Sequence, residues 1–157
     1  ATQLRGFEVV IFSATSEVKS RAEALAKEAD LEIIILPPSP NDEIINLMGR
    51  SRIAIGIGLT DGSPVSLLEA MIMGAFPIQA DTVSTAEWIR DGENGFLVPP
   101  EDPTSIAAAI QRALIDDELV GRAASLNKVI ADQRLDQAVL RPRIIDMYKK
   151  ASKCAFS

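Results

Sequence analysis

The hydrophobic pattern alternates between short apolar runs and longer stretches of helical composition. The runs are rich in β-branched and aromatic residues and are bounded by Pro, Gly or polar residues, which is typical of buried strands. The stretches between them carry apolar residues at helical spacing or begin at helix-starting residues. The pattern predicts strands over residues 7–12, 31–36, 52–57, 76–80 and 96–98, and helices over 17–29, 41–48, 64–73, 103–115, 118–131 and 133–150, with a helical turn over 85–90.

This order of elements predicts an α/β fold. Strands that read as continuous apolar runs are buried on both faces, and short connections to alternating helices favour a parallel sheet. We therefore expect one Rossmann-like, doubly wound parallel sheet flanked by helices, with a helical C-terminal end and no domain linker. Ligands of such folds bind beyond the carboxyl ends of the strands, and the turn over residues 58–66 follows one of these ends.

That turn leads into an apolar helix and predicts an anion site. Ser63 is a suitable N-cap and Pro64 suits the first helical position. The amides of a first helical turn have no partner within the helix, and the helix dipole makes that end positive. Pro64 has no N–H, so the amides of Val65 and Ser66 are the expected contacts for a phosphate.

Two carboxylates flank this turn. Asp61 precedes it, next to Gly62, and Glu69 follows eight positions later inside the helix. We expect the helix to be buried on most sides, so that Glu69 either pairs with an Arg or Lys, reaches solvent along a seam, or binds ligand hydroxyls in a cleft. Spacing alone leaves these alternatives open. Asp61 alone has a simpler explanation, because Asp-Gly pairs are common in turns. Together, the phosphate-friendly turn and the two carboxylates suggest a nucleotide-sugar site.

Other conspicuous residues have simpler interpretations. Gly56 and Gly58 lack the third glycine of a dinucleotide fingerprint and are expected to keep the end of a strand narrow. Glu87 follows another strand and is either a ligand contact or, as we slightly favour, a surface glutamate. Trp88, the only tryptophan, is interpreted as a core residue.

Composition excludes several classes of function. The net charge of −6 and the pI of about 4.7 disfavour nucleic acid as a partner. The sequence has no histidine, which excludes a Ser-His-Asp triad and a histidine-based zinc site within this chain. Its single cysteine supports neither a disulfide framework nor a cysteine metal site. Neither a membrane-length apolar run nor a signal peptide is visible, so the expected location is the cytoplasm.

Several linked motifs resemble the C-terminal domain of GT-B fold glycosyltransferases, especially the large retaining family 4. The family pattern begins with an acidic residue, Gly and two or three loop residues, followed by Leu-Glu-Ala-Met, a Gly and Pro-Val or Pro-Ile. Further along, a Glu precedes an Asp-Gly-x-x-Gly turn, a Leu-Val-Pro-Pro strand end and an Asp-Pro helix start. These motifs fall on residues 61–71, 74–78, 87, 91–95, 97–100 and 102–103, and a looser match extends from residue 7 to residue 114.

The resemblance implies a role for each position. Asp61 falls on the family's catalytic acidic position, which contacts the hydroxyls of the donor sugar, and Glu69 falls on the position that binds the ribose. Gly62, Ser63, Val65 and Ser66 lie in the loop that presents backbone amides to the diphosphate. Transfer in this family retains the anomeric configuration and needs no metal or other cofactor, because the protein stabilises the leaving diphosphate.

Departures from the pattern limit the expected activity. Asp stands at 61 where Glu is commoner, and Ser63-Pro64-Val65 replaces the frequent Phe-Gly-Leu. The family's phosphate-neutralising Arg and Lys would lie in a segment before residue 7. We therefore expect residues 1–157 to be one GT-B half-domain, a fragment that lacks the acceptor-binding N-terminal domain and is inactive or nearly so alone. Its expected partners are a nucleotide sugar and that N-terminal domain, with peripheral membrane contact open to the full protein.

Two other functions compete with this interpretation. One is a non-catalytic α/β module used for docking or regulation. The other is a sugar-nucleotide epimerase of related fold, which the absence of histidine disfavours.

Overall fold

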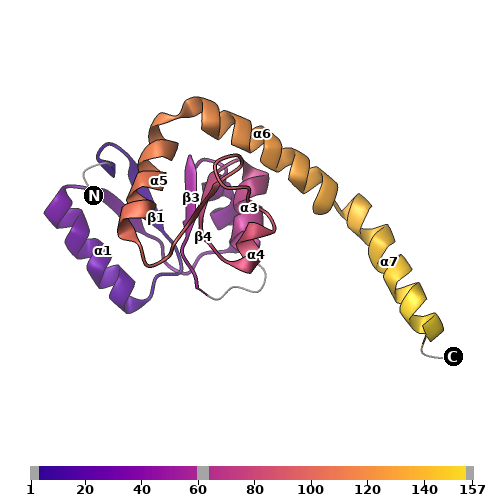
Figure 1. Ribbon diagram of the computed structural model, residues 1–157. Coiled ribbons are helices and arrows are strands. Elements are labelled where there is room, and N and C mark those ends of the chain that lie inside the picture. The colour runs from indigo at the N-terminus through magenta and orange to yellow at the C-terminus, as the bar shows by residue number, and fades with distance from the viewer. Residues whose placement is uncertain (1–3, 60–63, 155–157) are drawn as a thin grey trace. The chain divides into compact units, whose positions relative to one another are not determined.

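The computed structural model describes residues 4–59 and 64–154. The chain divides into two compact units, Ala1–Leu47 and Met48–Ser157, and each is described by itself. Figure 1 shows the elements in chain order.

The first unit contains a parallel strand pair. Strands β1 (Glu8–Ile11) and β2 (Glu32–Ile35) are joined by helix α1 (Ser16–Ala29), and helix α2 (Asn41–Met48) follows them. The register aligns Glu8 with Glu32 and Ile11 with Ile35. The α1 helix begins where the Thr15 hydroxyl accepts a hydrogen bond from the Val18 amide, and it ends at Asp30 in a left-handed conformation.

The second unit is built on a three-stranded parallel sheet of order β3-β4-β5. Its strands are β3 (Ile53–Gly56), β4 (Phe76–Ala80) and β5 (Phe96–Val98). Its helices are α3 (Val65–Met73), the short α4 (Val83–Ala86), α5 (Pro103–Ile115), α6 (Asp117–Arg134) and α7 (Gln137–Cys154). The parallel pairing predicted from the sequence is confirmed within each unit.

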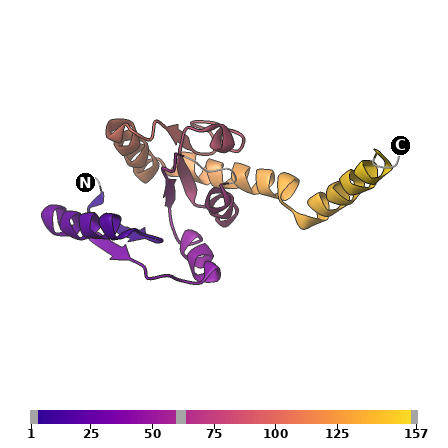
Figure 2. The same cartoon turned by 90° about the horizontal axis from the view of Figure 1, so that it is seen from below.

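Two apolar clusters cover the opposite faces of this sheet. On one face, Phe76 and Ile78 of β4 pack with residues of α5 and α6, including Ala113 and Leu119. On the other face, Leu67 and Met71 of α3 pack with Ile89. Figures 1 and 2 show α5 and α3 on opposite sides of β3 and β4. Because side chains alternate along a strand, Pro77 and Gln79 of β4 lie on the face that α3 covers.

Helix α6 contributes to both clusters. Leu119 and Ala123, from its first half, belong to the cluster beneath α5, whereas Ile130 packs against the cluster beneath α3. Arg52, just before β3, donates from Nε to the Ala113 carbonyl (2.9 Å) and places Nη2 2.6 Å from Asp117 Oδ1. These contacts fix the α5–α6 corner at the amino end of the sheet.

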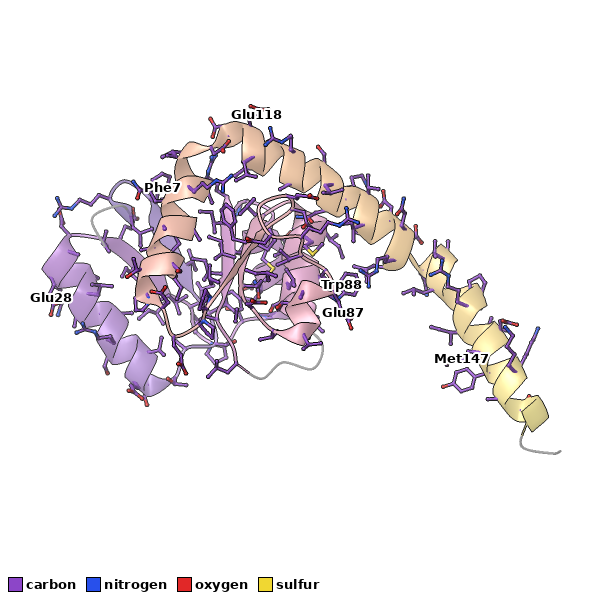
Figure 3. All side chains as sticks on the ribbon, in the orientation of Figure 1. Phe7, Glu28, Glu87, Trp88, Glu118 and Met147 are labelled. Atoms are coloured by element: carbon purple, nitrogen blue, oxygen red, sulfur yellow. The ribbon has the colours of Figure 1, made fainter. Side chains whose placement is uncertain are left out.

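The C-terminal helices differ from the sequence prediction in their bounds. The predicted break at residues 116–117 is confirmed, because Asp116 caps α6 by accepting from the Leu119 amide. The predicted end at residue 131 was wrong: α6 continues to Arg134, and α7 starts at Gln137 with Pro142 inside it. Residues 141–152 of α7 are all exposed, among them Met147, which is labelled in Figure 3.

Candidate functional site

The start of α3 lies at the carboxyl end of β3 and differs by one position from the prediction. Pro64 is the N-cap, with φ −76° and ψ 71°, and the helix begins at Val65 rather than at Pro64. The first intrahelical bond runs from the Leu68 amide to the Pro64 carbonyl (3.1 Å). The amides of Val65, Ser66 and Leu67 therefore precede the first intrahelical bond, and the two predicted anion donors, Val65 and Ser66, are exposed whereas Leu67 is buried.

Three of the predicted site residues cannot be placed. Asp61, Gly62 and Ser63 lie outside the described residues, so their predicted roles stay predictions. Val65, Ser66 and Glu69 are described, and the geometry of the site is built from them.

The outer face of α3 carries Glu69 and the exposed helix start. Leu67, Ala70 and Met71 are buried against the sheet, but Val65 is 57% exposed and Ile72 54% exposed. The prediction that α3 is buried on most sides was therefore wrong, because its apolar residues extend beyond the face that the core covers. Glu69 is half-buried, and Ser66, three positions earlier, lies on the same face and is exposed. The helix end and this carboxylate therefore share one accessible side.

Helix α3 ends at Gly74 as predicted. Gly74 has φ +88° and its amide donates to the carbonyls of Ala70 and Met71. A left-handed residue at this position suits glycine, and the chain then turns directly into β4.

A buried polar side chain lies at the carboxyl end of β4. Gln79 is 7% exposed and is the register partner of Gly56 at the end of β3. A Cβ added to Gly56 would lie 2.5 Å from Gln79 Oε1, so the side chain of Gln79 crosses the space that the glycine leaves free. Gly56 was predicted to keep the end of the strand narrow, and Gln79 is the neighbour that uses the space.

The α4 corner follows β4 at the same edge of the sheet. Thr82 and Thr85 form a reciprocal capping box, and the Thr85 hydroxyl also donates to the Ala80 carbonyl (2.6 Å). The helical turn predicted over residues 85–90 was misplaced, because this capping box starts α4 at Val83. Glu87 is exposed at the end of α4 and Trp88 is half-buried, and Figure 3 labels both.

Helix α6 holds the segment between α4 and β5 at two points. The Asn94 and Asn127 side chains are fully buried, and Asn94 Nδ2 donates to Asn127 Oδ1 (2.8 Å). Seven residues further along α6, Arg134 donates to the Glu87 carbonyl (2.8 Å) and places its guanidinium 3.7 Å from the centre of the Trp88 ring. Trp88 also contacts the α3 cluster, as the core interpretation predicted.

This contribution of α6 was not predicted from the sequence. Asn127 and Arg134 are separated by two helical turns and so lie on one face of α6, with the buried Ala131 between them. A polar residue within an apolar helical stripe is the signal that could have identified Asn127.

Within residues 4–59 and 64–154, no group of three or more His, Cys, Asp or Glu side chains could hold a metal ion. Over the same ranges, none of the helices combines the length and the apolar character needed to cross a membrane.

A family model and several relatives match this chain. The family model described as "Glycosyl transferases group 1" matches residues 5–130. An exopolysaccharide phosphotransferase from Streptomyces coelicolor is 32% identical over 108 residues, covering 67% of this chain and 11% of that protein. A D-inositol 3-phosphate glycosyltransferase from Acidothermus cellulolyticus is 29% identical over 114 residues, covering 69% of this chain and 25% of that protein. The chain thus spans a quarter or less of these two relatives.

A solved structure matches the fold over almost the entire chain. Alr3699/HepE from Anabaena, crystallised in complex with UDP, superposes with a TM-score of 0.81 at 18% identity, covering 95% of this chain and 43% of that protein. The GT-B, Rossmann-like fold expected from the sequence is therefore confirmed. Because the family model covers most of the sequence, the chain belongs to the family of group 1 glycosyl transferases.

Proposed function

We propose that this chain is the donor-binding part of a glycosyltransferase that moves a sugar from a nucleoside-diphosphate sugar to an acceptor. The observation that carries the proposal is the exposed start of α3. Its amides at Val65, Ser66 and Leu67 precede the first intrahelical bond at the carboxyl edge of the sheet, with Glu69 on the same outer side. A helix end of this kind stabilises a diphosphate through its amides and its dipole.

Each part of the donor has a proposed partner. The diphosphate lies at the amides of Val65 and Ser66, supported by the backbone of Gly62 and Ser63. Glu69 accepts hydrogen bonds from the ribose hydroxyls, and Asp61 acts at the transferred sugar. The amides stabilise the negative charge that develops on the leaving diphosphate, so the transfer needs no bound metal or other cofactor and proceeds with retention.

The proposal extends to the longer protein. The acceptor is bound by another part of that protein, the N-terminal domain, so the 157-residue chain alone transfers little or no sugar. The UDP and UDP-glucose complexes of Anabaena Alr3699/HepE make uridine nucleotides the first probes to use here.

Calorimetric titration of the chain with UDP, GDP and ADP tests the proposal. We expect at least one nucleotide to bind, and Glu69→Gln to weaken that binding by about tenfold or more, since hydrogen bonds to charged groups contribute about 1.5–3 kcal/mol. Glu118→Gln is the matched control, because Glu118 is exposed at the opposite, amino end of the sheet and pairs with Arg122. Absence of binding by all three nucleotides, or equal effects of the two variants, would contradict the proposal and favour a docking module.

A further inference from the structure

Gln79 is a polar residue in an otherwise apolar part of the second unit. It lies on the α3 side of the sheet, one position before the end of β4, and is 93% buried. The neighbouring β4 residues Phe76, Pro77 and Ile78 are buried and apolar. Within residues 4–59 and 64–154, we find no hydrogen bond made by the Gln79 side-chain amide. Its nitrogen and oxygen are not among the fully buried side-chain atoms that lack a partner, so the amide is open to a partner from outside the protein.

The backbone of β3 is shaped to accommodate this amide. Oε1, Nε2 and Cδ of Gln79 would lie 2.5, 3.0 and 3.1 Å from a Cβ at Gly56. The amide group therefore lies beside Gly56, the last residue of β3, in the space that a side chain at this position would otherwise fill. By contrast, a Cβ at Gly58 meets nothing within 4 Å, so the close approach is specific to Gly56.

This location is at the carboxyl end of β3, the end after which the chain leads to α3. Gly56 ends β3, and Pro64, buried at the N-cap, leads into the helix whose first amides face the carboxyl edge. The carboxyl edge of the sheet thus carries two features: a helix start that suits an anion, and a side-chain amide with no hydrogen-bond partner among the described residues. Glu69 lies on the outer side of α3, whereas Gln79 lies on the side of α3 that faces the sheet.

The chemistry of the amide selects the kind of partner. Phosphate oxygens only accept hydrogen bonds and are better matched by backbone amides or by Arg and Lys. A glutamine amide presents a donor and an acceptor side by side, which complements a hydroxyl that both donates and accepts. A neutral, bifunctional group at the edge of the sheet therefore suits a sugar hydroxyl.

We propose that Gln79 is a specificity-determining residue of the donor site, whose side-chain amide crosses Gly56 to hydrogen-bond a hydroxyl of the transferred sugar. This inference rests on the proposed function. The diphosphate is the middle of the donor, with the ribose on one side and the sugar on the other. With the diphosphate at the start of α3 and the ribose at Glu69 on its outer side, the sugar lies on the inner side, toward Gln79.

Affinities for nucleotides with and without the sugar test this assignment. The chain is titrated first with the nucleotides UDP, GDP and ADP. It is then titrated with the sugar conjugates UDP-glucose, UDP-galactose, UDP-N-acetylglucosamine, GDP-mannose and ADP-glucose. Amide NMR signals report binding in both series. We expect one conjugate to bind more tightly than its parent nucleotide. Gln79→Met, which keeps the length of the side chain but not its hydrogen bonds, should weaken that conjugate about five- to fiftyfold. It should leave the Kd of the parent nucleotide within about twofold.

Control variants make each outcome decisive. Gln133→Met makes the same change at an exposed position of α6 and should alter neither Kd. If Gln79→Met does not fold, Gln79→Glu removes the donor and keeps the size, and the same loss is expected for the conjugate. Equal weakening of conjugate and nucleotide, no change in either, or no gain from any sugar would overturn the assignment. Failure of every nucleotide to bind the unaltered chain would instead overturn the proposed function itself.

Discussion

Asn94 and Asn127 join the segment that precedes β5 to helix α6 through a reciprocal pair of hydrogen bonds. Asn94 Nδ2 donates to Asn127 Oδ1 at 2.8 Å, and Asn127 Nδ2 donates to the Asn94 carbonyl at 2.9 Å. Both side chains have no exposed surface. Asn94 also accepts from the Arg90 amide and donates to the Trp88 carbonyl, so one asparagine organises the whole turn.

Replacing Asn127 should destabilise the second unit strongly. Asn127→Ala leaves the buried Nδ2 of Asn94 without this partner and creates a cavity, and we expect a loss of about 2–4 kcal/mol in the free energy of unfolding. Urea denaturation measures it. Asn46→Ala, at an exposed position in α2, is the control and should cost less than about 0.5 kcal/mol. A loss for Asn127→Ala as small as that of the control would show that the pair does not stabilise the fold.

The stacking of Arg134 on Trp88 should be visible in fluorescence. Arg134→Ala removes a cation–π contact and the hydrogen bond to the Glu87 carbonyl, so we expect a red-shifted Trp88 emission and a loss of about 1 kcal/mol. Trp88 is the only tryptophan, which makes the spectrum specific. The comparison is Arg122→Ala, which breaks an exposed ion pair with Glu118 and should leave the emission unchanged. Identical spectra for Arg134→Ala and the unaltered chain would argue against the stacked geometry.

The close approach of Gln79 to Gly56 predicts a pattern of rescue. Gly56→Ala should cost no more than about 1 kcal/mol, because the new methyl group would overlap the amide at the flexible end of the Gln79 side chain, which must move aside. Gly58→Ala is the matched control, since a Cβ there meets nothing within 4 Å. In a chain that already carries Gln79→Ala, Gly56→Ala should cost much less free energy of unfolding than it does in the unaltered chain. Purely additive effects in the double variant would mean that the two residues do not compete for space.

The cap of α5 should make stability depend on acidity. Hydrogen bonds from the Ser105 side chain and from the Ser105 and Thr104 amides lower the pKa of Asp102 below its ordinary value of 3.8. A carboxyl whose pKa is lowered by folding stabilises the folded state at pH values above its pKa in the unfolded state. This contribution is lost as the pH falls through the pKa of the folded state. Asp102→Asn can still cap the helix but cannot titrate.

Urea unfolding of the unaltered chain and of Asp102→Asn, each at pH 7 and at pH 3, tests this dependence. The free energy of unfolding of the unaltered chain should fall more between these pH values than that of Asp102→Asn. The difference in this free energy between the two proteins should therefore be smaller at pH 3 than at pH 7. Equal losses in both proteins would contradict the coupling of this cap to protonation.

The ends of helices were predicted well from the sequence where a single local capping residue determines them. Gly74, with its left-handed φ of +88°, ends α3 as expected, and Asp102 starts α5 by accepting from the Thr104 amide. Local chemistry determines such ends, so one sequence is enough to identify them. The start of α4 was misjudged because two threonines, Thr82 and Thr85, cap each other, and this pairing is not the usual Ser/Thr-x-x-Glu signature.

Long-range polar contacts could not be predicted in the same way. Asn94 and Asn127 are 33 positions apart, and Arg134 meets the Glu87 carbonyl across 47 positions. Nothing in the local pattern pairs these residues, because their contact depends on how α6 passes from one face of the sheet to the other. At the candidate site, the sequence predicted the start of α3 to within one residue and proposed a role for Glu69, but the close approach of Gln79 to Gly56 required the register of β3 and β4.

The central claim is that the start of α3 binds a nucleoside diphosphate. An amide NMR titration of the 157-residue chain with UDP, GDP and ADP tests it most directly. We expect saturable shifts at Val65, Ser66, Leu67 and Glu69, and weaker shifts in Glu69→Gln. Shifts confined to surfaces away from the carboxyl edge of the sheet, or identical shifts in Glu69→Gln, would contradict it.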